Sequence, residues 1–258
     1  MEALPSYLRL FASGELARRA ALATALLARC TLCPRRCQVD RLAGERGFCR
    51  SGAVARVASW NRHVWEEPPI SGSRGSGTIF FSGCTAACLF CQNFPISQLG
   101  VGQDVSTERL AEMMLELQAM GCHNLNLVTA THFVPQVLSA LLLAIPQGFR
   151  LPLVYNTSGY ESVATLRLLE DVIDIYLPDA KYASDATARR LSGFTRYVAF
   201  NRDASGRCTA RSGQSSVSTA MAWQCADSLS ATWCCLAALR AAARWLVGWR
   251  HISRRRSM

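Results

Sequence analysis

Between residues 76 and 191 the chain alternates short β-branched or aromatic segments with helical segments, and this alternation limits the fold more than any other feature. The four strand-like segments are 78–81, 124–129, 151–155 and 172–177. The helical segments are 106–120, 134–145, 161–170 and 185–191. Strands that alternate with helices form βα units and a parallel sheet. We therefore predict an α/β fold with four βα units, in which Ser106 caps the first helix and Gly121 ends it.

A polar cluster follows each predicted strand. The clusters are residues 82–84, 129–132, 156–159 and 178–181. In parallel α/β folds, ligands bind at the carboxyl ends of the strands. The sequence therefore predicts a functional site at this edge of the sheet.

Composition excludes several classes of protein. Half of the residues are hydrophobic and 18% are charged, which is incompatible with disorder throughout. No apolar run approaches the ~20 residues that cross a bilayer, and the N-terminus makes a poor signal peptide, so we expect a cytoplasmic protein without a membrane partner. The net charge is +10, but residues 203–258 hold 8 basic and 2 acidic residues and so contribute +6 of it. Because residues 1–202 show no basic and aromatic interleaving, we do not expect nucleic-acid binding.

Three of the twelve cysteines lie in the loop after the first predicted strand, as Cys84-x3-Cys88-x2-Cys91. Cysteines in a cytosolic chain are more often ligands or catalysts than disulfides. Three thiolates can hold three irons of a [4Fe-4S] cluster and leave the fourth iron open to a small ligand. The alternative is a zinc site with a fourth ligand from elsewhere.

With Phe90 before its last cysteine, this triplet resembles the C-x3-C-x-Φ-C signature of radical S-adenosylmethionine (SAM) enzymes, where Φ is aromatic. More closely, the chain resembles the branch that is similar to pyruvate formate-lyase activating enzymes. The segments that carry the resemblance are 79–84, 91–93, 126–133, 155–160 and 174–181, within about residues 30–202.

The resemblance implies an oxidoreductase with a [4Fe-4S] cluster and SAM as cofactors. The reduced cluster would cleave SAM to methionine and a 5′-deoxyadenosyl radical, which abstracts hydrogen from a substrate such as a glycine of a glycyl radical enzyme. A one-electron donor such as flavodoxin or ferredoxin would be a partner. The alternatives are the same chemistry on another peptide or small molecule, and a non-catalytic iron-sulfur or zinc protein.

Within residues 1–75, the pattern of Leu and Ala predicts an amphipathic helix over 5–29, and the Cys-, Arg-, Gly- and Pro-rich residues 30–75 predict an irregular segment. The resemblance implies that 76–202 form a partial (β/α) barrel, truncated here to about four βα units, and it also implies cofactor-binding residues. Phe90 would pack near the adenine, and Thr129 and Thr131 would replace the Gly-Gly-Glu with which relatives bind the SAM amino group. The candidates for other SAM or substrate contacts are Asn156, Ser158, Asp179 and Lys181. For these four the alternatives are an Asx or Ser turn and a surface ion pair.

A second group of cysteines precedes the barrel: Cys30, Cys33, Cys37 and Cys49. Four thiolates suffice for a zinc ion or a fully ligated cluster, and the alternative is a set of reduced thiols in a packed cap. Cys122 stands alone, and we expect it to be a small buried apolar residue.

Residues 203–258 do not continue the pattern. They carry four of the six Trp and four of the twelve Cys, with few acids and no strand signal. Back-translation with GC-rich codons and a shifted frame yields segments of balanced charge that resemble a fifth βα unit. We therefore hypothesise that the coding frame slips near residues 202–204 and that this tail is out of frame, which would leave the chain unstable or inactive. Resequencing the DNA of homologous isolates tests this hypothesis.

Overall fold

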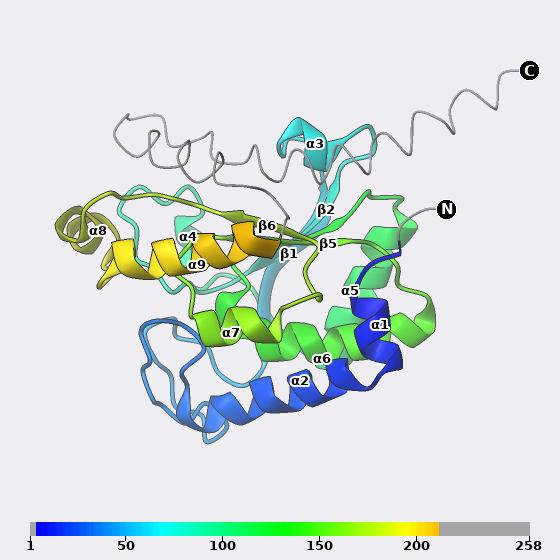
Figure 1. Ribbon diagram of the computed structural model, residues 1–258, viewed down its shortest axis with the longest axis horizontal. Coiled ribbons are helices and arrows are strands. Elements are labelled where there is room, and N and C mark those ends of the chain that lie inside the picture. The colour runs from blue at the N-terminus through cyan, green and yellow to red at the C-terminus, as the bar shows by residue number, and fades with distance from the viewer. Residues whose placement is uncertain (1–3, 212–258) are drawn as a thin grey trace, which may run out of the picture.

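The computed structural model describes residues 4–211, and the side chains of residues 4–207. Six strands form one mixed open sheet in the order β3-β1-β2-β4-β5-β6 (Figure 1). The strands are β1 (Ala55–His63), β2 (Ser76–Phe81), β3 (Gln103–Val105), β4 (Leu125–Val128), β5 (Leu153–Thr157) and β6 (Ile175–Pro178). The predicted α/β class is therefore confirmed.

The four predicted strands are β2, β4, β5 and β6, and they run parallel to one another. Helices cross between them, as a parallel arrangement requires. They are α4 (Phe94–Ser97) and α5 (Thr107–Ala119) before β4, α6 (Val134–Ala144) before β5 and α7 (Val163–Leu168) before β6, with 3₁₀ turns at Thr131–Phe133 and Ile145–Gln147. Helices α8 (Asp185–Ser192) and α9 (Tyr197–Arg211) follow β6. The Ser106 side chain accepts a hydrogen bond from the Arg109 amide at 3.1 Å and Gly121 has φ 77°, so both predicted ends of α5 are confirmed.

The N-terminal segment has more structure than the sequence suggested. The predicted irregular stretch 30–75 contains β1 and the short helix α3 (Pro68–Ser71), so that prediction is wrong there. β1 pairs antiparallel with β2 and β3 and thereby extends the parallel sheet. The predicted helix 5–29 is interrupted: α1 (Tyr7–Ala12), α2 (Glu15–Ala25) and a 3₁₀ turn (Leu26–Arg29) replace it. The break falls at Gly14, whose φ of 76° is left-handed.

The two faces of the sheet differ in chemistry. One face carries Ile79, Leu127 and Tyr155, which lie in the main hydrophobic core. Helices α2, α5 and α6 gather on one side of the sheet in Figure 1, and their apolar residues belong to the same core. The other face carries Thr78, Asn126 and Asn156, because neighbours along a strand point to opposite sides, and we call it the polar face after these residues. It also carries Val154 and Leu177, which pack with Ile70 in a small apolar cluster. The polar face and the carboxyl ends of the strands together define where a ligand can be bound.

The last described helix passes the predicted boundary at residue 202. α9 runs from Tyr197 to Arg211, and Ala204 is buried in the main core. The Arg207 guanidinium pairs with Glu170 at 2.9 Å. The rest of the predicted out-of-frame tail, residues 212–258, lies outside the described residues, so the frame hypothesis stays a prediction. Within residues 4–211, no helix combines the length and the apolarity needed to cross a bilayer.

Candidate functional site

The loop after β2 begins with a glycine that the packing requires. Gly83 has φ 80°, and a Cβ at this position would lie 2.6 Å from the Cys49 carbonyl oxygen. A side chain here would therefore clash with backbone as well as strain the left-handed conformation. Gly83 thus brings the loop of the cysteine triplet directly against the N-terminal cysteine segment.

The triplet loop is held by backbone contacts from the end of α8. The Ala87 amide donates to the Ser192 carbonyl at 3.0 Å, and the Leu89 amide donates to the Leu191 carbonyl at 2.9 Å. From the opposite side, the Gln98 side-chain amide donates to the Cys88 carbonyl at 2.9 Å. The loop is therefore positioned by elements that are far apart in sequence.

Each thiol of the triplet has a local polar neighbour. Cys84 Sγ accepts from the Ala86 amide at 3.4 Å, and Cys88 Sγ accepts from Ser192 Oγ at 2.9 Å. Cys91 Sγ lies 3.2 Å from Ser97 Oγ. Burial raises the pKa of Cys84 to about 12, and nearby Cys88 and Cys91 act in the same direction. A bound cation would therefore be needed to make the Cys84 thiol anionic at neutral pH.

The three thiols are neighbours, but they are not arranged as a finished metal site. Across residues 4–211, no group of three or more His, Cys, Asp or Glu side chains is placed so that it could hold a metal ion as it stands. The donor set itself suits an iron-sulfur cluster, because thiolates are the ligands that such clusters use.

Phe90 and Leu89 project from the triplet loop into solvent. Their exposed fractions are 56% and 76%, values that a packed apolar side chain does not have. Phe90 does not contribute to the core. Its ring can therefore cover a ligand that lies beside the loop.

The strand ends hold a buried carboxylate that the sequence analysis missed. Glu161 is 1% exposed and accepts hydrogen bonds from Thr131 Oγ1 at 2.6 Å and Tyr155 Oη at 3.3 Å, and also from Thr157 Oγ1. Burial raises the pKa of Glu161 to about 7, against the effect of these donors. The predicted site residue Thr131 is thus paired with a carboxylate. The only sequence signal is a Glu two residues after the polar cluster 156–159, at the predicted start of a helix.

Asn126 is the second residue that the analysis did not single out. It lies on the polar face of β4, is fully buried, and neither its amide oxygen nor its amide nitrogen has a hydrogen-bond partner within the described part of the chain. A buried amide without partners is costly, and such groups are rare in folded proteins. Asn126 is therefore available to a ligand on this face.

The other predicted cofactor residues lie at the same edge of the sheet. Thr129 follows β4 with φ 58°, and Asn156 is half-buried near the end of β5. The Ser158 carbonyl accepts from Tyr197 Oη at 2.9 Å. Lys181 Nζ lies 2.5 Å from Asp179 Oδ2, and although burial opposes it, this carboxylate raises the pKa of Lys181. Burial raises the pKa of Cys84 and Cys88, and the positive charge of Lys181 opposes this rise at both thiols. The ion pair therefore lies beside the triplet and not on a remote surface.

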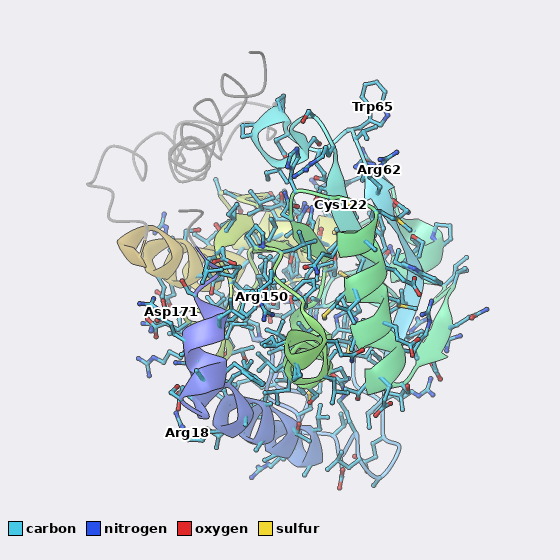
Figure 2. The ribbon with its side chains drawn as sticks, turned by 90° about the vertical axis from the view of Figure 1, so that its right-hand side faces the viewer. Arg18, Arg62, Trp65, Cys122, Arg150 and Asp171 are labelled. Carbon is cyan, nitrogen blue, oxygen red and sulfur yellow. The ribbon has the colours of Figure 1, made fainter. Side chains whose placement is uncertain are left out.

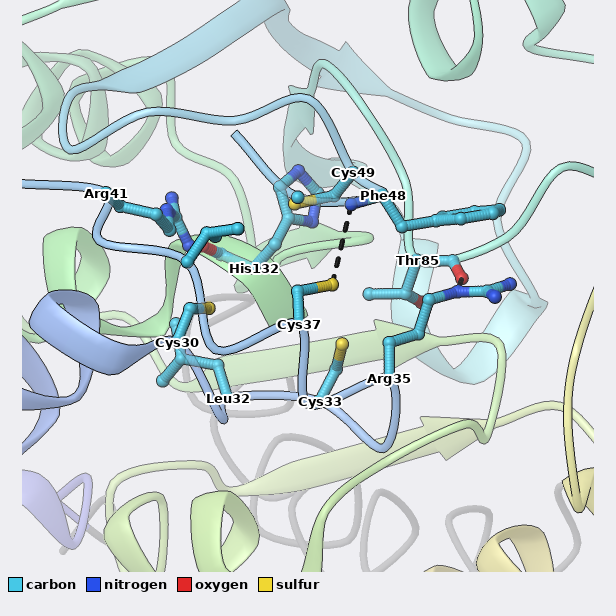
Figure 3. A pocket seen from close by; sticks show the side chains of 12 residues that line it. Cys30, Leu32, Cys33, Arg35, Cys37, Arg41, Phe48, Cys49, Thr85 and His132 are labelled. Carbon is cyan, nitrogen blue, oxygen red and sulfur yellow. Dashed lines mark hydrogen bonds between the residues drawn. The ribbon is translucent and has the colours of Figure 1, made fainter. Parts of the chain in front are cut away.

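The four N-terminal cysteines line one small pocket (Figure 3). Cys30 and Cys33 are buried, Cys49 is half-buried and Cys37 is exposed. The Phe48 amide donates to Cys37 Sγ at 3.5 Å. Arg35, Arg41 and His132 also line the pocket. The sequence placed the four cysteines together, but it gave no sign that two arginines and a histidine join them.

Comparison with known proteins adds a relative but no function. No family model matches the chain. An uncharacterized protein of Methanocaldococcus jannaschii, MJ0674, is 32% identical over 173 residues, which cover 65% of this chain and 50% of that protein. The chain thus spans about half the length of the relative that it matches. The relative's description names no activity, so function has to be argued from the site.

Proposed function

We propose that this protein is a radical SAM oxidoreductase of the branch that resembles pyruvate formate-lyase activating enzymes. The observation that carries the proposal is the position of Cys84, Cys88 and Cys91. They follow the first parallel strand, at the edge of the sheet where the polar strand ends meet. The loop from Ser82 to Gly102 contains three cysteines and no fourth, as a cluster with one open iron requires.

The chemistry would come from the bound cofactors. A [4Fe-4S] cluster and SAM, when bound, supply one-electron cleavage of a carbon–sulfur bond and a 5′-deoxyadenosyl radical that abstracts hydrogen. The chain would contribute three thiolates, from Cys84, Cys88 and Cys91, as cluster ligands. A ferredoxin or flavodoxin would provide the electron.

Residues of the polar face would bind and orient SAM. The unpartnered amide of Asn126 can donate and accept hydrogen bonds, and Asn156 lies on the same face. Thr129 and Thr131 follow β4, and Glu161 holds the Thr131 hydroxyl. Phe90 is exposed enough to stack on an adenine, and the Asp179–Lys181 pair is close to the triplet. The four parallel strands β2, β4, β5 and β6 would form the wall of a partial barrel, with the polar face inside.

The substrate would be a molecule that gives up a hydrogen atom. A glycine of a partner protein is the hydrogen donor that the resemblance favours, and another peptide or a small molecule is the alternative. The exposed triplet loop leaves room for a macromolecular substrate, because Leu89 and Phe90 are accessible from outside.

A second candidate is a non-catalytic metal-binding protein. It is favoured by the pocket that four cysteines line, because four thiolates can close a metal site without an open position. In this case the triplet would hold a metal with no open position, and SAM would not be cleaved.

Anaerobic reconstitution with iron and sulfide separates the two candidates. Under the proposal, the wild-type chain gains about four irons at the triplet and releases 5′-deoxyadenosine from SAM when dithionite is added. Cys88→Ala abolishes this release, whereas Cys122→Ala, which changes a cysteine outside both groups, leaves it intact. A cluster without SAM cleavage supports the second candidate. Activity that survives Cys88→Ala contradicts the assignment of the triplet.

A further inference from the structure

The pocket of Cys30, Cys33, Cys37 and Cys49 contains a fifth donor. His132 is 2% exposed and lines the pocket, although it comes from the turn after β4, about a hundred residues further along the chain. Its Nε2 lies 2.9 Å from the Ser82 carbonyl oxygen. Because a carbonyl can only accept, the proton is on Nε2, and Nδ1 carries a lone pair.

Nδ1 of His132 has no hydrogen-bond partner among the described residues. Histidines that bind metals use one ring nitrogen as ligand and donate the other N–H to a carbonyl or carboxylate. His132 already has this arrangement on its Nε2 side. The buried Nδ1 of His132 has a lone pair without a donor, in a pocket that four cysteines also line. This combination points to a cation in the pocket.

The charges around the pocket point to an anionic complex. Arg41 is 1% exposed and donates to the carbonyls of His132 (at 2.7 Å) and Gly52. Arg35 donates to the Thr85 carbonyl at 2.7 Å and the Gly193 carbonyl at 2.8 Å. No carboxylate pairs with either guanidinium among the described residues. A divalent ion bound by four thiolates carries a net charge of −2, and one bound by three thiolates and a neutral imidazole carries −1, so either complex would offset positive charge of the two guanidiniums.

The size of the pocket favours a single ion. Its free space is close to that of one water molecule. A single ion therefore fits it with less rearrangement than a cube of four irons and four sulfides. Zinc is the ion that combines thiolate and imidazole ligands in a tetrahedral site.

We propose that residues 30–49 and His132 form a structural Zn²⁺ site, with four of the five donors Cys30, Cys33, Cys37, Cys49 and His132 as ligands. The thiols that bind release their protons to solvent, and they turn about their Cα–Cβ bonds, because as they stand they are not at coordinating positions. Because Cys37 is exposed, the ion can reach the pocket from solvent at this residue. This site is separate from the triplet and does not depend on the proposed SAM chemistry.

The zinc site would also stabilise the triplet loop. Arg35 lies between Cys33 and Cys37 in sequence, and it holds the carbonyl of Thr85, next to Cys84. Its guanidinium lies 3.3 Å from the centre of the Phe48 ring, next to Cys49. An ion that fixes Cys33, Cys37 and Cys49 therefore fixes the group that holds the loop.

Metal analysis of the full chain, expressed with added zinc, tests the site. We expect about one zinc per chain, and replacement of zinc by Co²⁺ should give the visible bands of a tetrahedral thiolate site. Cys33→Ser/Cys37→Ser leaves three of the five donors, too few for a closed site, and should lose the ion. Cys122→Ser is the matched control and should keep it, as should Cys84→Ala/Cys88→Ala/Cys91→Ala, whatever the outcome of the SAM assay.

Three results would overturn the proposal. They are a wild-type chain without stoichiometric zinc, zinc retained by the Cys33→Ser/Cys37→Ser variant, and iron that stays on the chain when the triplet is removed. The cobalt measurement uses the wild-type chain, so it remains decisive if the double variant fails to fold. Hydrogen exchange of the amides of residues 85–89 should become faster when zinc is chelated, and unchanged exchange would contradict the coupling through Arg35.

Discussion

The two groups of cysteines lie on segments that meet at Gly83, and they differ in how many metal-binding side chains each brings together. The N-terminal four line a small pocket together with His132, Arg35 and Arg41. The triplet lies on a loop whose tip, Leu89 and Phe90, is exposed, and its sequence offers no fourth thiol nearby. Structural metal sites are closed by protein ligands, whereas catalytic sites keep a position open. The comparison therefore supports both proposals, a structural ion in the pocket and a reactive cluster on the loop.

Gly83→Ala is the strongest way to break this arrangement, because it separates the two groups. The new Cβ would meet the Cys49 carbonyl oxygen at 2.6 Å in a left-handed conformation. We expect a loss of about 3 kcal/mol in the free energy of unfolding, from strain and overpacking together. Urea denaturation measures it.

Gly14→Ala is the matched control for that substitution. Gly14 has φ 76°, but a Cβ there meets nothing within 4 Å. Only the left-handed strain of about 1 kcal/mol should then appear. Equal losses at the two positions would show that the contact with Cys49 does not hold the groups together.

Glu161→Gln tests whether the carboxyl group at the strand ends destabilises the fold when it becomes charged in its buried position. The folded-state pKa of about 7 exceeds the ordinary 4.5, so the stability that the protonated group contributes is complete below pH 4.5 and is lost as pH rises through 7. The difference between the two values corresponds to about 3 kcal/mol at most. Denaturation of wild type and variant between pH 4.5 and 8.5 measures it, and parallel profiles would contradict the burial of charge.

Arg35→Met tests the link between the two groups directly. It removes the hydrogen bonds to the Thr85 and Gly193 carbonyls and the contact with Phe48. Hydrogen bonds from charged groups contribute about 2 kcal/mol each, and we expect a loss of that order in the free energy of unfolding, since the methionine still packs. Arg46→Met, at an exposed position of the same segment, should change stability little. If both variants behave alike, Arg35 does not join the groups.

Ser192→Ala is the smallest test and acts on the triplet side of Gly83. It removes the donor to Cys88 Sγ and the hydrogen bond between the Ser192 and Tyr182 hydroxyls, and a neutral hydrogen bond of this kind contributes about 1 kcal/mol. The variant should be slightly less stable and should keep the same zinc content as wild type. A change in zinc content would show that the two groups are not independent sites.

Local sequence information was sufficient for a large part of this protein. The four parallel strands, the cap at Ser106 and the stop at Gly121 follow from periodicity and from the chemistry of single residues, so they could be predicted. The cysteine spacings likewise placed each group on its own segment. Such features depend on neighbours within a few positions of one another.

Tertiary structure decided which residues from distant parts of the sequence lie in contact. β1 was missed because its residues show weak alternation and pair with β2 only once the sheet exists. Glu161 meets Thr131 across two strand ends, Asn126 is buried without a partner, and His132 reaches the pocket of cysteines from nearly a hundred residues away. The sequence determined which residues carry the chemistry, and only the fold determined which of them share a site, because contacts between distant segments depend on packing that no local pattern encodes.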